Sequence, residues 1–184
     1  MNASARRRLL APSFLLAAAL AGCGGSSQPS DDAPAAKLDA CTLFTYEDAE
    51  AAAGESVSTM ASTLDEAVGR DPSECLYNSG TETQPRILSL LIRYHRNPEA
   101  AERIQKSSRS SFRAMSGGQV REVPDLGDGA LWVGGRIQQL HVLAGSRQLV
   151  ITVQSPDGTE QFPRARQIAV KVLERLKASE KKTA

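Results

Sequence analysis

The sequence predicts a single domain of the α/β class in the α+β arrangement, with an antiparallel sheet flanked by helices. Three observations predict this fold. Residues Ile87–His95 alternate with apolar groups on both faces, which is typical of a central strand. Gly134-Gly135 and Gly145-Ser146 are two-residue hairpin signals, which predict an antiparallel meander. Apolar residues recur at helical spacing in two later stretches, 101–115 and 162–176.

The amino-terminal stretch predicts export from the cytoplasm. Three arginines at positions 6–8 precede a short apolar run that ends in Leu20-Ala21-Gly22-Cys23. This ending resembles the lipobox of bacterial lipoproteins, in which the signal is cut before a cysteine that carries diacylglycerol. The resemblance implies a signal peptide over residues 1–22 and lipidation of Cys23. The alternative is an ordinary secretory signal with a chance cysteine at its end.

The predicted location is a membrane surface facing outside the cytoplasm, with the amino-terminal lipid as the membrane contact. No later apolar run is long enough to span a bilayer. In a Gram-negative host, Gly24 lacks the aspartate associated with inner-membrane retention, so we expect the periplasmic side of the outer membrane. Residues 23–37, rich in Gly, Ser, Pro and Asp, predict a flexible tether. The folded domain is expected over residues 38–178 and a charged tail over 179–184.

Charge excludes one class of partner. Removal of residues 1–22 takes away three arginines and no acid, which leaves 19 of the 22 basic residues against 21 acidic ones, a formal charge of −2. A nucleic-acid-binding domain needs a clustered basic face. We therefore expect no nucleic-acid partner.

Cys41 and Cys75 form an even pair once Cys23 is assigned to lipid. In an exported protein such a pair predicts a disulfide. A metal or redox pair is the alternative, but the sequence has no CxxC motif and its two histidines are isolated. The disulfide would stabilise the fold by roughly 3–4 kcal/mol.

Local signals place the remaining elements in order. Thr45 is predicted to cap a short helix ended by Gly54, and Cys75 to begin a strand. Asn97-Pro98 starts the next helix, which Gly117-Gly118 ends. Further strands are expected at 120–123, 130–133, 136–143 and 148–154, with Asp128 holding a turn or, as the alternative, binding a cation. The last helix begins between Thr159 and Pro163.

Two-residue turns in the meander assign its faces, because they place Trp132 opposite Ile137 and Leu140 opposite Ile151. The core face then carries Leu131, Val133, Leu140, Val142, Leu149, Ile151 and Val153. The mixed face carries Trp132, Ile137, Gln139, His141, Val150 and Thr152. We expect the 162–176 helix on the core face and the 101–115 helix, interrupted by serines, over part of the mixed face.

Several of these motifs resemble one family. They are Cys41-x-Leu43-Phe44-Thr45 before an acidic, alanine-rich helix, Cys75-x-Tyr77, and Leu126-Gly127-Asp128-x-Ala130-x-Trp132. Together they resemble uncharacterised secreted lipoproteins of actinobacteria, a domain of unknown function related in fold to PsbP-like proteins. The resemblance covers roughly residues 38–178. It implies an antiparallel sheet flanked by helices, no assigned catalytic residue, and protein or small-ligand partners.

The sequence favours a binding or structural module over an enzyme. It contains no GxSxG, HExxH, Walker A or dinucleotide motif, and no cofactor or metal is expected. The predicted contact for an envelope protein or small ligand is a shallow pocket on the mixed face, lined by Trp132, Gln139, His141 and Thr152. The alternative is a small hydrolase or isomerase that uses His141 or His95.

Overall fold

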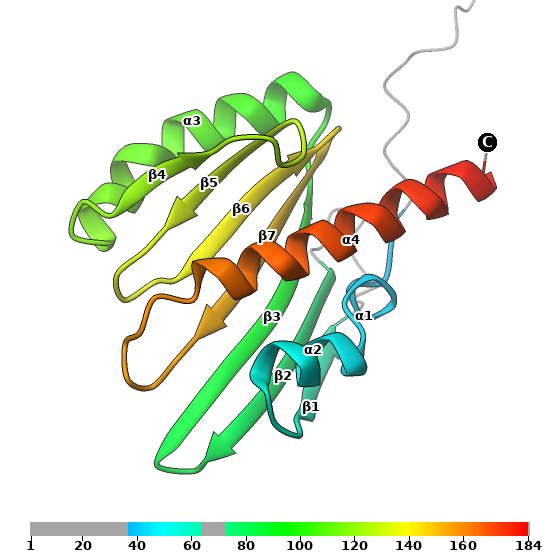
Figure 1. Ribbon diagram of the computed structural model, residues 1–184. Helices are drawn as coiled ribbons and strands as arrows, with labels where there is room; N and C mark the ends of the chain where they lie inside the picture. The colour runs from blue at the N-terminus through cyan, green and yellow to red at the C-terminus, as the bar shows by residue number, and fades with distance from the viewer. Residues whose placement is uncertain (1–36, 64–72, 184) are drawn as a thin grey trace, which may run out of the picture. The chain divides into compact units, whose positions relative to one another are not determined.

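Seven antiparallel strands form the centre of the domain in this computed structural model, which describes residues 37–63 and 73–183. The strand order across the sheet is β1-β2-β3-β7-β6-β5-β4 (Figure 1). The expected α+β class is therefore confirmed. The predicted signal peptide, the lipid site at Cys23 and the tether up to residue 36 lie outside the described residues.

The elements follow the chain in two halves. The first half contains α1 (Ala40–Leu43), α2 (Tyr46–Ala53), β1 (Ser58–Thr63), β2 (Ser73–Thr81) and β3 (Gln84–Tyr94). The second half contains α3 (Pro98–Met115), β4 (Val120–Val123), β5 (Gly129–Val133), β6 (Gln139–Ala144), β7 (Arg147–Gln154) and α4 (Phe162–Thr183). No helix within the described residues has the length and apolar character needed to cross a membrane.

The predicted helix boundaries are confirmed where capping chemistry defines them. The Thr45 hydroxyl accepts from Asp48 N, while the Asp48 carboxylate accepts from Thr45 N, a reciprocal pair that satisfies two amides at the start of α2. Gly54 ends α2 with φ 76°. Asn97 Oδ1 accepts from Ala100 N at 2.9 Å at the start of α3. The exception is the expected tail at 179–184, because α4 remains helical through Thr183.

Each face of the sheet has its own helical cover. α1, α2 and α4 lie on one face, where α4 crosses β6 and β7 (Figure 1). The main core lies beneath these helices and includes Leu88, Leu90, Ile92, Leu140, Ile151, Val172 and Leu176. α3 lies on the other face over β4 to β7, and Ala101 is its buried residue. Both helices therefore lie on the faces that their apolar stripes predicted.

The predicted face of β5 is wrong. The connection between β5 and β6 spans residues 134–138, instead of the two residues expected. Trp132 therefore pairs with Leu140 and not with Ile137. This odd shift in register moves every β5 side chain to the opposite face. Trp132 therefore belongs to the main core, while Leu131 and Val133 lie on the α3 face. The predicted register between β6 and β7, with Leu140 opposite Ile151, is confirmed.

Contacts with residues 116–119, directly after α3, explain why the two glycines do not form a two-residue hairpin turn. Gly134 N donates to Gln119 O at 2.7 Å. Gly135 has φ 62°, and a Cβ atom added there would lie 2.8 Å from Ser116 O. The glycines therefore let the chain approach the carboxyl-terminal end of α3, a contact between distant segments that local turn signals do not encode.

The predicted disulfide between Cys41 and Cys75 is present and joins α1 to β2. The Cα atoms are 5.0 Å apart, within the usual range for a bridge. Cys75 is fully buried and belongs to the main core. The bond therefore fixes the first described helix to the interior of the sheet.

Candidate functional site

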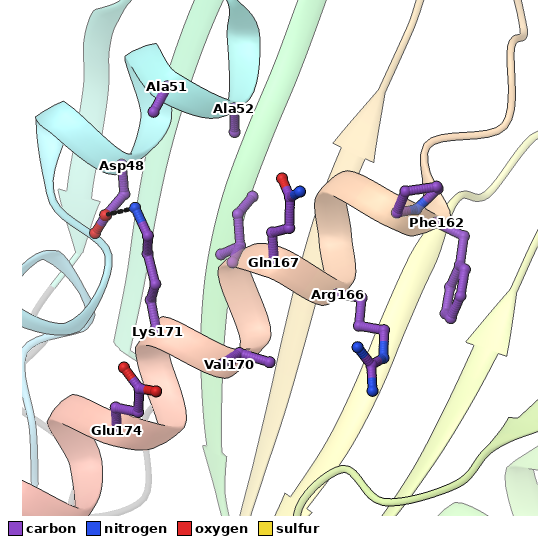
Figure 2. Close-up of a pocket in the computed structure, with 11 residues that line it drawn as sticks. Asp48, Ala51, Ala52, Phe162, Arg166, Gln167, Val170, Lys171 and Glu174 are labelled. Atoms are coloured by element: carbon purple, nitrogen blue, oxygen red, sulfur yellow. Dashed lines mark hydrogen bonds and ion pairs between the residues drawn. The ribbon is translucent and has the colours of Figure 1, made fainter.

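A groove of about 630 Å³ runs between α2 and α4 on the surface of the domain. Figure 2 shows its walls, with Ala51 and Ala52 on α2 and the first three turns of α4 opposite. Alanines on α2 keep that wall low, because their side chains end at Cβ. The groove is therefore open along the line where the two helices face each other.

The lining combines an apolar floor with polar flanks. Phe162, Pro163, Ile168 and Val170 supply apolar groups, and Val170 is 37% exposed. Arg166, Gln167, Lys171 and Glu174 supply hydrogen-bonding and charged groups. Figure 2 shows Gln167 directed toward α2. An apolar centre with a polar rim is the composition of protein interfaces.

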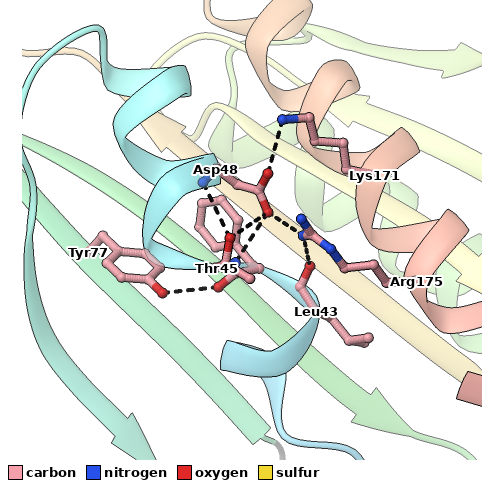
Figure 3. A network of polar contacts seen from close by, with 7 residues as sticks. Leu43, Thr45, Asp48, Tyr77, Lys171 and Arg175 are labelled. Atoms are coloured by element: carbon pink, nitrogen blue, oxygen red, sulfur yellow. Dashed lines mark hydrogen bonds and ion pairs between the residues drawn. The ribbon is translucent and has the colours of Figure 1, made fainter.

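Asp48 of α2 links the two walls of the groove, because its side chain bonds residues of α4. Its carboxylate is 6% exposed and accepts from Lys171 Nζ at 3.0 Å and from Arg175 Nη1 on α4 (Figure 3). Burial raises the pKa of Asp48, but hydrogen bonds from Arg175, Lys171 and Thr45 outweigh that effect and hold the pKa well below its usual range. The carboxylate is therefore charged at neutral pH and fixes α4 against α2.

Two further hydrogen bonds extend this network to the sheet. Arg175 Nη1 also donates to Leu43 O at 2.7 Å, which ties α4 to the end of α1. The Tyr77 hydroxyl on β2 donates to Phe44 O at 3.0 Å (Figure 3). The backbone between α1 and α2 is thus held from both sides. These contacts fix both walls of the groove.

Trp132 does not line an open pocket. Its side chain is 2% exposed and packs against Phe162 with ring centroids 5.4 Å apart. The Arg121 guanidinium lies over the Phe162 ring, 4.0 Å from its centroid. Trp132 therefore supports Phe162, which lines one end of the groove, and lies on the opposite face from the residues predicted to accompany it.

The other three predicted contact residues stay together on the α3 face. Gln139 Nε2 donates to Thr152 Oγ1 at 3.3 Å across β6 and β7. His141 is 2% exposed and stacks on Phe112 of α3 with ring centroids 4.6 Å apart. α3 thus covers His141, and the shallow pocket predicted beside Trp132 and His141 does not form as expected.

Both histidines are at least half-buried, and each has a ring nitrogen without a hydrogen-bond partner in the described residues. Neither ring nitrogen of His141 has a hydrogen-bond partner among the described residues. Burial, with a smaller effect of Arg93, lowers the pKa of His141 to about 4. His95 is half-buried, and its Nε2 also has no partner within the described part of the chain. No nucleophile is bonded to either imidazole there.

The side chain of Asp128 and possible metal-binding groups are the remaining features of the described residues. Asp128 Oδ2 accepts from Gly145 N at 2.6 Å, so its side chain holds backbone as expected, although at the turn between β6 and β7. Within residues 37–63 and 73–183, no three His, Cys, Asp or Glu side chains form a group that could hold a metal ion.

Sequence reasoning missed the role of Asp48. Its position in the first turn of a helix predicted only a favourable interaction with the helix dipole. Lys171 lies 123 positions later and Arg175 127 positions later, so nothing local pointed to them. The available signal was the spacing of Lys171 and Arg175, which places two cations on one face of α4.

Comparison with known proteins gives no relative. No family model matches the chain, and neither a curated protein nor a solved structure matches it significantly. The site must therefore be judged from its own geometry.

Proposed function

We propose that this chain is a lipid-anchored binding module that faces outside the cytoplasm. The observation that carries the proposal is Leu20-Ala21-Gly22-Cys23 at the end of a short apolar run that follows three arginines. The disulfide between Cys41 and Cys75 supports it, because such bonds persist in oxidising compartments. The resemblance to secreted actinobacterial lipoproteins agrees with the same assignment.

The groove between α2 and α4 is the recognition surface of this module, and its partner is a protein of the cell envelope. Its apolar floor, mixed charges and fixed walls match an interface better than an enclosed small-molecule site. Both signs of charge flank the floor, with Arg166 and Lys171 against Glu174. A partner segment with apolar anchors and both signs of charge would therefore fit.

Anchoring is tested with Cys23→Ser in the full chain. The wild-type protein should sediment with membranes, and mass spectrometry should find diacylglycerol on Cys23 at the mature amino terminus. Cys23→Ser should release the protein or leave the signal uncut. An unmodified Cys23 at the mature amino terminus would refute the lipid anchor.

Recognition is tested by site-specific photo-crosslinking in intact cells. A photoreactive residue at Val170 should give one discrete adduct, because this side chain lies at the exposed edge of the groove floor. Ile104, a similarly exposed apolar residue on α3, is the matched control and should give none. Gln167→Arg should abolish the Val170 adduct. Equal adducts at both positions, or none at Val170, would contradict the assignment of the groove.

A further inference from the structure

α3 is attached to the sheet less firmly than α4. Of its 18 residues, Ala101 is the buried one. Its polar contacts with the described strands are an ion pair between Arg109 and the exposed Glu122, and a long hydrogen bond of 3.5 Å from Gln148 Nε2 to Gln105 Oε1. α4, by contrast, buries Ala165, Ile168, Ala169, Val172, Leu173 and Leu176. Release of α3 would therefore break few contacts and leave the main core, on the other face, intact.

The sheet face beneath α3 carries a second apolar layer. Four of its side chains are almost inaccessible to solvent, namely Leu131, Val133, Leu143 and Val150. They come from β5, β6 and β7 and do not belong to the main core. α3 is the helix that covers this part of the sheet (Figure 1). The folded domain thus hides an apolar surface under its loosely attached helix.

His141 lies within this layer. Leu131 of β5 and Val150 of β7 are directly opposite it on the neighbouring strands, and Phe112 of α3 stacks on its imidazole. The side chain is 2% exposed, and neither ring nitrogen has a hydrogen-bond partner in the part of the chain that the structure describes. A neutral imidazole packs here as an apolar ring. An imidazolium would be a buried charge without an acceptor, which is costly.

The charged groups around His141 supply no counter-ion. Burial, and after it the Arg93 cation of β3, lowers the pKa of His141 to about 4. Arg109 of α3 is a second cation, and Glu122 of β4 is already paired with it. The sides of β5, β6 and β7 that face α3 carry no other charged residue along their described lengths. A proton on His141 is therefore better solvated when α3 moves away.

Two consecutive glycines join α3 to β4. Gly117 has φ 64° and Gly118 has φ 90°, both are exposed, and a Cβ atom added to either would meet nothing within 4 Å. Residues at the end of an element, with room to change their dihedral angles, are typical hinges. Beyond them, the carbonyl oxygen of Gln119 accepts from Gly134 N. The glycines can therefore rotate while β4 stays in the sheet.

We propose that α3 is an acid-operated lid: protonation of His141 releases the helix about Gly117-Gly118 while the rest of the domain stays folded. Opening uncovers the apolar layer of β5, β6 and β7, so acid turns a hidden surface into an exposed one. The lid lies on the opposite face of the sheet from the groove between α2 and α4. It depends neither on that groove nor on the lipid anchor.

The direction of the pH effect follows from the two states. In the open state His141 is solvated and has the ordinary histidine pKa of 6.5, whereas in the closed state its pKa is about 4. The open state binds the proton more tightly, so opening is least favoured above pH 6.5 and increases as the pH falls toward 4. Between pH 7.5 and pH 5, the equilibrium constant for opening should rise about 30-fold.

Hydrogen exchange of the purified full-length protein tests the lid. After correction for the intrinsic pH dependence of exchange, the protection of α3 amides 102–115 should fall about 30-fold between pH 7.5 and pH 5. The amides of α4 should stay more protected than those of α3 at both pH values. Equal protection of the two helices at pH 5 would mean that α3 leaves only by global unfolding, which would overturn the proposal.

His141→Leu should remove the pH dependence of α3 protection, and His95→Gln, a histidine outside this layer, should retain it. Phe112→Ala gives a second test that leaves the histidine in place. Loss of the covering ring should lower α3 protection already at pH 7.5, with α4 unchanged. The lid is also overturned if α3 protection is the same at both pH values in the wild type, if His141→Leu declines as the wild type does, or if Phe112→Ala leaves α3 protection unaltered.

Discussion

His141 is a buried titratable residue on the α3 face of the sheet. Its imidazole lies between the sheet and Phe112, and Arg93 is close enough to disfavour a second positive charge. A histidine in this position is neutral when the domain is folded. Its side chain therefore acts as an aromatic packing group at neutral pH, and protonation opposes the docking of α3.

His141→Leu should make folding stability less sensitive to acid. The folded-state pKa is about 4, whereas the unfolded chain has a histidine pKa of about 6.5. The unfolded chain binds the proton more tightly, so stability is full above pH 6.5 and falls as the pH drops toward 4. The total loss from this group is roughly 3 kcal/mol. Urea unfolding across this range should show a smaller decline in His141→Leu.

His95→Gln is the comparison variant, because its imidazole is only half-buried and should contribute less to the decline. An acid dependence in His141→Leu equal to that of the wild type would show that the imidazole is solvated or paired in solution.

Residue-level features were predictable where the partner lies within a few positions. Thr45 and Asn97 cap their helices through amides three residues away, and the sequence identified both. Asp48 was predicted to be an ordinary helix-start acid because Lys171 and Arg175 come from the far end of the chain. Contacts of that range depend on how α4 crosses the sheet, which no local pattern specifies.

Among the elements, the connection into β5 shows why Leu126, Gly127 and Asp128 occur together. Asp128 N donates to Leu143 O at 2.8 Å, and its carboxylate accepts from Gly145 N. Gly127 lies against β6, where an added Cβ atom would be 2.3 Å from Leu143 O. Gly127 and Asp128 therefore attach the start of β5 to the end of β6 and to the turn that follows.

Gly127→Ala should destabilise the domain more than Gly145→Ala. The two glycines have nearly equal φ, 60° and 58°, so both substitutions cost about 1 kcal/mol for the left-handed backbone. An added Cβ atom meets Leu143 O at Gly127 but nothing within 4 Å at Gly145. We expect about 2–3 kcal/mol more loss at Gly127. Urea unfolding measures both variants, and equal losses would contradict the close approach to β6.

The elements themselves were largely predictable, but one face assignment failed. Strand alternation located β3, β6 and β7, and the Gly145-Ser146 turn gave the correct register for the last two. Gly134-Gly135 gave the same local signal but contacts Ser116 and Gln119, directly after α3. Since a strand has a period of two, this one error exchanged Trp132 with its neighbours and grouped it with side chains of the opposite face.

At the scale of the whole molecule, the disulfide between Cys41 and Cys75 is the main covalent constraint on the described fold. It spans 34 positions and joins α1 to β2. By restricting the unfolded chain, a loop of this length contributes roughly 3–4 kcal/mol. The bridge thus supplies a large share of the stability of a domain of this size.

Cys41→Ala combined with Cys75→Ala should therefore lower the free energy of unfolding by roughly 3–4 kcal/mol. Urea unfolding measures the loss, and reduced wild-type protein should match the double variant. In the unreduced wild type, neither cysteine should react with a thiol probe. Labelling of both residues before reduction would contradict the bridge.

The position of that bridge also determines how the domain carries mechanical load. A pull on the chain ahead of Cys41 passes through the sulfur atoms into β2, which is bonded to β1 on one side and β3 on the other. Tension between the two chain ends bypasses residues 42–74, because they lie inside the covalent loop. That loop contains α2, one wall of the groove. A partner held in the groove would therefore contact a wall that the stretched backbone does not pull apart.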